Sequence, residues 1–405
     1  MSADSALRRP GGRWKAGDEW GAMTAQSWWG GELLAHGAHD AVFARVGCEV
    51  TFGELRAEVA ELATMLRGHG IRAGNTVALQ GTPSFTQLWS IFALWSLGAQ
   101  VLLFEPRLRR QERTALLQTC APQFFVTFGG LYRRTDIFVH QCEVLVRRIA
   151  GGRPAHSSHC VVQFSSGTTG RPKAIGRTSE SLLGELDRLR TLGEMPKAGE
   201  RVAVLESVTH SFGLIGGLLY ALGTGATTVF PTANTPRASA QAAALAHVVI
   251  GNPRHFAQLA DADDDVALPY LRLAVSGGDA LSRTVSEAFG RRFGVQIGQA
   301  YGITETGIIA ADLAGLFGTP TIGLPVQGVR TRVVGGVLEV HVPQSPYLYQ
   351  DQPWCGGWMS THDLVTRDPE TGVLRLRGRS TGVFHNGSPR SRGRDDGLAS
   401  LCERR

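Results

Sequence analysis

Short apolar segments alternate with helical patterns along most of this chain, and no other sequence feature limits its fold as strongly. Strand candidates occur at 76–80, 100–104 and 123–127, with helical segments between them. The helical patterns further along include 211–222 and 282–292. A second series of strand candidates accompanies them at 160–164, 201–205, 226–230, 247–250, 271–275 and 295–299. Such alternation predicts the α/β class, with two doubly wound α/β subdomains.

After about residue 320 the pattern changes to short strands alone. Segments 330–334 and 337–342, joined by Gly335-Gly336, form a hairpin signal. Further strands are predicted at 364–367 and 373–377. We therefore expect a small β-barrel-like unit at about 320–378.

Two local signals concern the first subdomain. Thr51 and Glu54 form a capping box that opens a helix to about Gly68. The stretch 85–103 carries no charge, but it contains several polar residues, and Gly98 is well placed to end a helix before a strand. This predicts a buried helix followed by a buried strand, and no membrane span.

Net charge and cysteine spacing argue against a nucleic-acid-binding, a zinc-binding and a disulfide-rich protein. The chain has 405 residues and a formal net charge of +6, with 43% hydrophobic and 19% charged residues, which is typical of a globular protein. The positive excess is spread over polar tails and body without a basic stripe, so we expect no nucleic-acid partner. The six cysteines are scattered without zinc or disulfide spacing, which predicts a cytoplasmic protein.

The segment Ser165-Ser166-Gly167-Thr168-Thr169-Gly170-Arg171-Pro172-Lys173 follows a short apolar strand. Glycines let backbone N–H groups face an anion, hydroxyls add donors, and lysine supplies positive charge, so the segment suits phosphate binding. Lys173 is one of only three lysines in the chain. The spacing is not that of a Walker A loop. A flexible Ser/Gly turn is the alternative interpretation.

This nine-residue segment resembles the phosphate loop of the adenylate-forming superfamily, which comprises acyl-CoA ligases, luciferases and peptide-synthetase adenylation domains. Four further segments resemble family motifs and follow in family order. They are Ser276-Gly277-Gly278-Asp279, Tyr301-Gly302-Ile303-Thr304-Glu305, Gly357-Trp358-Met359-Ser360-Thr361-His362-Asp363-Leu364 and Gly378-Arg379. The shared order from 165 to 379 makes the resemblance specific. His362 is a departure, because the family usually has Gly there.

The resemblance implies an AMP-binding large domain at 23–378, a hinge remnant at 379–387, and disordered tails at 1–22 and 388–405. It implies ATP and Mg²⁺ as ligands, with Glu305 as the metal ligand. The implied nucleotide-binding residues are Ser165, Ser166, Gly167, Thr168, Thr169, Gly170, Lys173, Gly277, Gly278, Asp279, Tyr301, Thr304, Asp363 and Arg379. The residues implied to act in catalysis are Lys173, Thr304, Glu305 and Arg379. Taken singly, Tyr301 also fits core packing, Glu305 a surface carboxylate and Asp363 a turn.

The implied reaction joins a small-molecule carboxylic acid to AMP and passes the acyl group to the thiol of CoA or of carrier-protein phosphopantetheine. The residues implied to line the acid pocket are His210, Phe212, Gly216 and Gly302. His210 also fits an ordinary helix-start histidine. Amino-acid-activating relatives usually place an Asp near this point, and none stands here, which favours an acid without an α-amine.

The chain departs from the family at its end. Family members continue with a small domain that carries a catalytic lysine, whereas only 18 residues follow Gly387 and no lysine follows Lys197. This predicts a truncated ligase, either natural or produced by a frameshift. Three interpretations stay open: a ligase that is weak or needs a small domain in trans, a catalytically silent nucleotide- or acyl-binding remnant, and a loading module for an acyl carrier protein.

Overall fold

Two β-sheets organise the computed structural model, which describes residues 28–129, 137–165, 173–348 and 357–380. The first sheet has the strand order β6-β5-β3-β4-β7-β8, and its central strands are parallel while both edge strands are antiparallel. The strands are β3 (Thr76–Gly81), β4 (Gln100–Leu103), β5 (Phe124–Phe128), β6 (Val144–Arg148), β7 (His159–Ser165) and β8 (Lys173–Thr178). Helices α2 (Phe52–Gly68) and α3 (Phe85–Ser96) cover one face, and α4 (Arg110–Cys120) covers the other.

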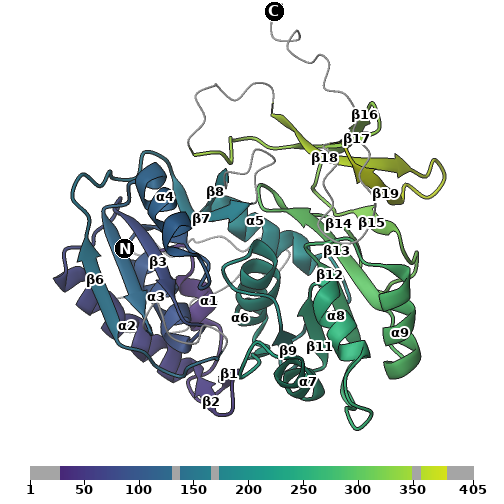
Figure 1. Ribbon diagram of the computed structural model, residues 1–405, viewed down its shortest axis with the longest axis horizontal. Helices are drawn as coiled ribbons and strands as arrows, with labels where there is room; N and C mark the ends of the chain where they lie inside the picture. Colours follow the sequence, from purple (N-terminus) through teal and green to yellow (C-terminus); the bar gives the residue numbers. More distant parts are fainter. Residues whose placement is uncertain (1–27, 130–136, 166–172, 349–356, 381–405) are drawn as a thin grey trace, which may run out of the picture.

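The second sheet begins with a parallel set in the order β13-β12-β11-β9-β10-β1, with β2 antiparallel at the edge. Its strands are β1 (Val42–Arg45), β2 (Glu49–Thr51), β9 (Arg201–Val204), β10 (Thr227–Val229), β11 (Val248–Gly251), β12 (Leu273–Gly277) and β13 (Ile297–Ile303). Helices α5 (Ser179–Arg190) and α6 (Tyr220–Thr224) lie between the two sheets (Figure 1). The outer face is covered by α7 (Pro236–Ala244), α8 (Pro253–Ala260) and α9 (Arg283–Phe293).

The β-rich end is antiparallel and continues the second sheet. Its strands are β14 (Gly307–Asp312), β15 (Thr321–Pro325), β16 (Thr331–Val334), β17 (Val337–His341), β18 (Trp358–Arg367) and β19 (Leu374–Arg379). Strand β15 pairs with β14 on one side and with β19 on the other, so both parts belong to one sheet of 13 strands. The predicted α/β class, with two α/β layers, is confirmed. The strands expected to form a small β-barrel-like unit at about 320–378 instead continue the second sheet, with β16 as its edge strand.

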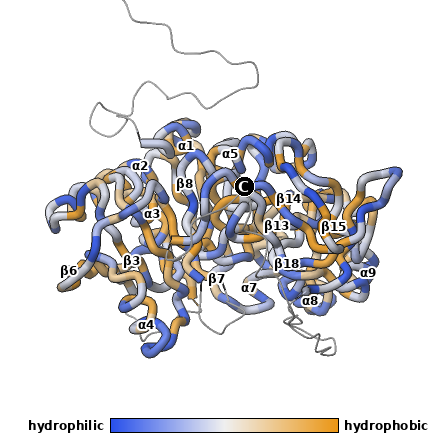
Figure 2. Tube along the Cα trace, turned by 90° about the horizontal axis from the view of Figure 1, so that it is seen from above, coloured by the Kyte–Doolittle hydropathy of each residue, from blue (hydrophilic) through white to orange (hydrophobic). Residues whose placement is uncertain are grey.

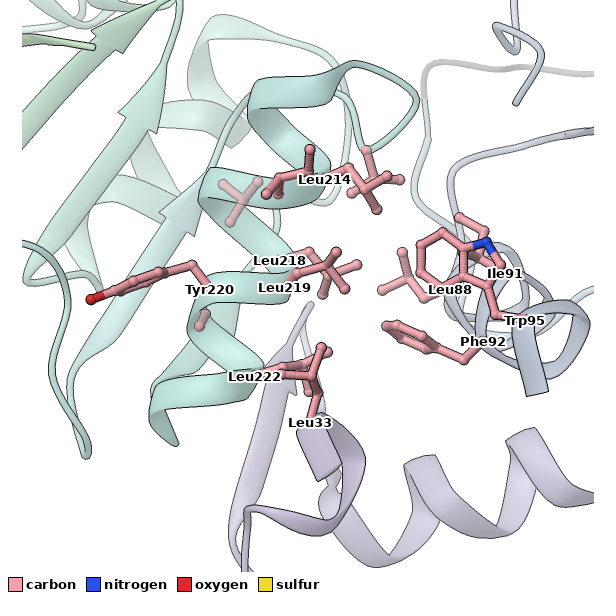
Figure 3. Packing of buried hydrophobic residues seen from close by; sticks show 14 of the residues in the cluster. Leu33, Leu88, Ile91, Phe92, Trp95, Leu214, Leu218, Leu219, Tyr220 and Leu222 are labelled. Carbon is pink, nitrogen blue, oxygen red and sulfur yellow. The ribbon is translucent and has the colours of Figure 1, made fainter. Parts of the chain in front are cut away.

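Helix α3 packs against the segment that follows β9, and this contact holds the two halves of the molecule together. Every residue from Phe85 to Trp95 is buried. Leu88, Phe92 and Trp95 point toward Leu218 and Leu219, and short helix α1 (Gly31–Ala35) adds Leu33 to the same cluster (Figure 3). Each large apolar side chain contributes about 1.5–3 kcal/mol when fully buried. Figure 2 shows the apolar stretches gathered in the interior, with polar stretches along the outer loops.

The two helix predictions that rested on capping residues are confirmed. Thr51 accepts from the Glu54 backbone, and the Glu54 side chain accepts from Thr51. Gly98 has φ +72°, in the left-handed region that ends α3. The helix predicted at 211–222 winds differently from an α-helix: residues Phe212–Leu219 form a π-helix, η1, that leads into α6.

No helix among the described residues is both long and apolar enough to cross a membrane, and the uncharged stretch folds into α3 followed by β4. The described cysteines Cys48, Cys142 and Cys160 are free thiols. The tails predicted at 1–22 and 388–405 lie outside the described residues, and the predicted hinge at 379–387 is described only to Ser380. These domain boundaries stay predictions.

Candidate functional site

The predicted site residues follow strands whose carboxyl ends meet at one edge. In a parallel sheet, the segments after neighbouring strands lie together, and ligands bind there. Ser165 ends β7, Gly277 ends β12, and Thr304 and Glu305 follow β13. Glu105 follows β4 of the first sheet, and Thr209 follows β9 of the second. The Thr209 hydroxyl donates a hydrogen bond to the Glu105 carboxylate, which joins these edges of the two sheets.

The predicted phosphate loop sits within a hairpin. Strands β7 and β8 are antiparallel and flank the loop. Half-buried Ser165 and Lys173 are paired with each other, directly before and directly after the loop. The candidate residues Ser166, Gly167, Thr168, Thr169 and Gly170 lie outside the described residues, so their placement is untested. Lys173 therefore enters the site as the first residue of a regular strand.

Lys173 and Glu305 are brought together although 132 positions separate them in the sequence. The Lys173 ammonium lies 5.6 Å from the centre of the Tyr347 ring, and the Tyr347 hydroxyl lies close enough to the Glu305 carboxylate to lower its pKa. Burial raises the pKa of Glu305 above its usual value, while a backbone hydrogen bond and the charges of Lys173 and Arg379 act in the opposite direction. Glu305 is thus a partly buried carboxyl group near the cations Lys173 and Arg379. The two cations can bind a negatively charged ligand, and the carboxylate can bind a metal ion.

Tyr301, Asp363 and Arg379 form a second cluster on β13, β18 and β19. The Tyr301 hydroxyl donates to Asp363 Oδ2 at 2.6 Å, and Arg379 Nε donates to Asp363 Oδ1 at 2.8 Å. Thr361 Oγ1 accepts from the Asp363 backbone N–H at 3.1 Å. Burial, followed by the Asp363 charge, raises the pKa of Tyr301 well above its usual value, so the phenol keeps its proton and acts as the donor.

His362 adopts a backbone conformation that favours glycine. Its φ of +60° lies in the left-handed region, where glycine is favoured and a histidine is strained. Burial lowers the pKa of His362, and the nearby charges of Lys173 and Arg379 lower it further. The departure from Gly therefore leaves the local turn intact and puts an imidazole between two cations.

The turn at 304–306 is held from behind by helix α5. Glu185 Oε1 accepts from the Ile308 backbone N–H at 3.0 Å, and Glu185 Oε2 pairs with buried Arg177 at 2.8 Å. A Cβ on Gly307, which has φ +74°, would lie 1.9 Å from the same carboxylate. Gly302 is similarly confined, since a Cβ there would lie 2.4 Å from the Gly307 carbonyl oxygen. Strand β8, which begins with Lys173, is thus tied through Arg177 to the turn that carries Glu305.

Phe212 packs against two glycines, one of which is the nucleotide candidate Gly277. A Cβ on Gly277 would lie 2.8 Å from the Phe212 ring, and one on buried Gly216 would lie 3.1 Å from it. The ring therefore lies flush against two glycines, one on β12 and one on η1. π-Helical turns are frequent at functional sites, because the extra residue per turn redirects side chains. Gly278 and Asp279 follow β12 and are exposed.

His210 lies where the two sheets meet. Its Nε2 lies 3.3 Å from Glu105 Oε1, and both side chains are about half exposed. Thr209 Oγ1 donates to the same Glu105 oxygen, and buried Gln163 donates to the Thr209 carbonyl at 2.7 Å. His210 therefore has a carboxylate partner, Glu105, which an ordinary helix-start histidine does not need.

The donor set fits magnesium bound together with phosphate. No group of three or more His, Cys, Asp or Glu side chains in the described ranges could hold a metal ion by itself. Mg²⁺ at nucleotide sites is usually held by one or two carboxylates plus phosphate oxygens, so Glu305 alone suffices on the protein side.

Sequence reasoning missed Glu105, Arg177, Glu185 and Tyr347. Glu105 and Tyr347 act through partners far away in the chain, so no local motif marks them. Arg177 and Glu185 lie eight residues apart, on either side of the start of α5, and this ion-pair spacing was the signal available.

Comparison with known proteins gives consistent results. A family model described as AMP-binding enzyme matches residues 34–344. The anthranilate–CoA ligase of Pseudomonas aeruginosa is 29% identical over 376 residues, which cover 81% of this chain and 70% of the relative. The 4-hydroxybenzoate–CoA/benzoate–CoA ligase of Rhodopseudomonas palustris is 26% identical over 401 residues, covering 83% and 70%.

A third relative is the p-hydroxybenzoic acid–AMP ligase of Mycobacterium tuberculosis, 26% identical over 365 residues. The match covers 83% of this chain, which spans about half, 52%, of that relative's length. Among solved structures, the anthranilate CoA ligase AuaEII in complex with anthranoyl-AMP superposes with a TM-score of 0.72 at 20% identity, covering 88% of this chain and 78% of that one. At this identity the structural likeness shows the fold alone.

Proposed function

The chain belongs to the AMP-binding enzyme family of adenylate-forming acid–CoA ligases, and we propose that it activates an aromatic carboxylic acid with ATP and transfers the acyl group to a thiol. The acid carboxylate attacks the α-phosphorus of ATP and expels pyrophosphate, giving an acyl-adenylate. A thiol of CoA or of a carrier-protein phosphopantetheine then displaces AMP. The proposal includes a cytoplasmic location, which rests on the scattered cysteines alone.

One observation carries the proposal: Lys173, Glu305 and the Asp363–Arg379 pair surround the same edge of the sheets. Lys173 and the preceding loop hold the β- and γ-phosphates, and Thr304 contacts the α-phosphate. Glu305 would hold magnesium, which would supply positive charge to neutralise the phosphates. Asp363 and Arg379 hold the ribose while Tyr301 packs on the adenine. Catalysis of this step consists of positioning and charge neutralisation, and it needs no covalent attachment to the protein.

The aromatic acid class is supported by Phe212, which lies beside Gly277 at the end of β12. Its ring packs against Gly216 and Gly277 and is an apolar surface that suits a planar substrate. The curated relatives act on anthranilate and on benzoate or 4-hydroxybenzoate. His210 and Glu105 lie where the two sheets meet, and we assign them to the polar side of the acid site. Phe212→Ala should therefore change the KM for the acid several-fold while leaving the KM for ATP nearly unchanged.

The test is ATP–pyrophosphate exchange with benzoate, 4-hydroxybenzoate, anthranilate and phenylalanine. The chain is assayed alone and with a separately expressed small domain of a related ligase. We expect exchange with an aromatic acid and none with phenylalanine. ATP binding without exchange under every condition would favour a catalytically silent nucleotide-binding protein, and failure to bind ATP·Mg²⁺ would refute the assigned site. Product analysis with CoA against a phosphopantetheinylated carrier protein identifies the acceptor.

A further inference from the structure

The segment 346–348 crosses from the β-rich end to the edge of the first sheet. Tyr347 forms an antiparallel bridge with Ile175 of β8. Two backbone hydrogen bonds flank it: Gly176 N–H donates to the Pro346 carbonyl at 2.7 Å, and Leu348 N–H donates to the Ala174 carbonyl at 3.4 Å. Tyr347 is thus anchored to the strand that begins with Lys173.

This close approach depends on a glycine. A Cβ on Gly176 would lie 2.3 Å from Leu348 Cδ1 and 2.6 Å from the His159 ring. Any larger residue would have to displace the Leu348 side chain or the His159 ring. The backbone around Tyr347 therefore has a fixed place relative to Lys173.

The Tyr347 side chain contacts both charged groups of the phosphate region. Its ring lies 5.6 Å from the Lys173 ammonium, within range of a cation–π interaction. Its hydroxyl donates to Met359 Sδ at 3.7 Å and lies close enough to the Glu305 carboxylate to lower its pKa. No salt bridge joins Lys173 directly to Glu305 among the described residues, although the two attract each other.

We propose that Tyr347 is a positioning residue that holds the Lys173 ammonium on its ring and the Glu305 carboxylate on its hydroxyl, keeping the two apart for nucleotide. A direct Lys173–Glu305 ion pair would neutralise the cation meant for phosphate and the anion meant for metal. Tyr347 prevents this pairing with one rigid side chain, because its ring and hydroxyl point to different partners. The inference rests on the proposed function and adds a residue to its machinery.

Two substitutions separate the two contacts. Tyr347→Phe keeps the ring and loses the hydroxyl beside Glu305, so ATP affinity should fall about five- to tenfold in Mg²⁺ and stay unchanged in EDTA. Tyr347→Leu loses both contacts, so ATP affinity should also fall about two- to tenfold in EDTA. Calorimetric titration with ATP measures all four values, and thermal unfolding confirms that each variant is folded.

Tyr270 provides the matched control. It lies 4.8 Å from Arg201 in a similar cation–π contact, on the exposed surface outside the site. Tyr270→Phe and Tyr270→Leu should leave ATP affinity unchanged in both buffers. If folded Tyr347 variants bind ATP as the unaltered chain does, or if Phe and Leu give the same loss in both buffers, the inference is overturned and the proposed function stands. If the unaltered chain binds no ATP·Mg²⁺, both are overturned.

Discussion

Tyr301 donates a hydrogen bond of 2.6 Å to Asp363 across 62 residues of sequence, and Arg379 binds the other oxygen of the same carboxylate. Tyr301→Phe removes one bond and keeps the ring, so we expect a loss of about 1 kcal/mol of unfolding free energy and little change in ATP affinity. Asp363→Ala leaves both donors without their acceptor, so ATP affinity should fall at least about tenfold. Urea unfolding and ATP titration measure the two effects. Equal losses of ATP affinity in the two variants would contradict the assignment of Asp363 to ribose.

Lys173 and Glu305 carry the charges that face phosphate and metal. Lys173→Ala and Glu305→Gln should each weaken ATP·Mg²⁺ binding about 10- to 100-fold, since a hydrogen bond to a charged group contributes about 1.5–3 kcal/mol. Lys197→Ala is the control, because Lys197 is exposed and lies before β9, away from the site. Unchanged nucleotide affinity in both site variants would show that the site is assigned wrongly.

His362 makes stability depend on pH. Its pKa in the folded chain is lowered by burial and by two cations, so below about pH 6.5 the unfolded chain takes up a proton more readily than the folded one. Stability should therefore fall as pH drops from about 6.5 toward the lowered pKa. His362→Asn tolerates the left-handed backbone and does not titrate, so its unfolding free energy should fall less steeply between pH 7 and pH 5. Parallel pH profiles of the two proteins would exclude this role.

The buried Arg177–Glu185 pair should be among the most sensitive positions in the fold. Arg177→Met leaves an unpaired carboxylate with only 5% of Glu185 exposed, which costs about 3–5 kcal/mol. Adding Glu185→Leu should recover part of this loss, although the Ile308 N–H then lacks its acceptor. Urea unfolding of the single and double variants gives the coupling. The exposed Arg283–Glu287 pair on α9 is the comparison, and breaking it should leave stability nearly unchanged.

Most of the parallel strands, helix α2 and the β16–β17 hairpin could be predicted because their signals are local. Apolar runs marked the parallel strands, the Thr51 capping box marked α2, and Gly335-Gly336 marked the β16–β17 hairpin. The π-helical winding of η1 was not predictable, because one extra residue per turn leaves the same apolar composition. Strand β8 was also missed, since a motif matched to phosphate binding gave no reason to expect regular pairing from Lys173 onward.

The site was predictable only where a motif carried it. Tyr301, Asp363 and Arg379 were selected by resemblance, and the structure brings them into one hydrogen-bonded cluster. Tyr347 and Glu185 depend on pairing between distant strands and helices, which periodicity does not report. The Asp363–Tyr301 hydrogen bond could not be derived, because the sequence does not show how β13 and β18 lie relative to one another.

Strand β15 hydrogen-bonds to β14 along one edge and to β19 along the other. Heat cannot melt the antiparallel end without stripping hydrogen bonds from an edge of the parallel core. The two parts should accordingly lose structure in a single cooperative calorimetric transition, and the Asp363–Arg379 clamp should have no independent melting temperature of its own.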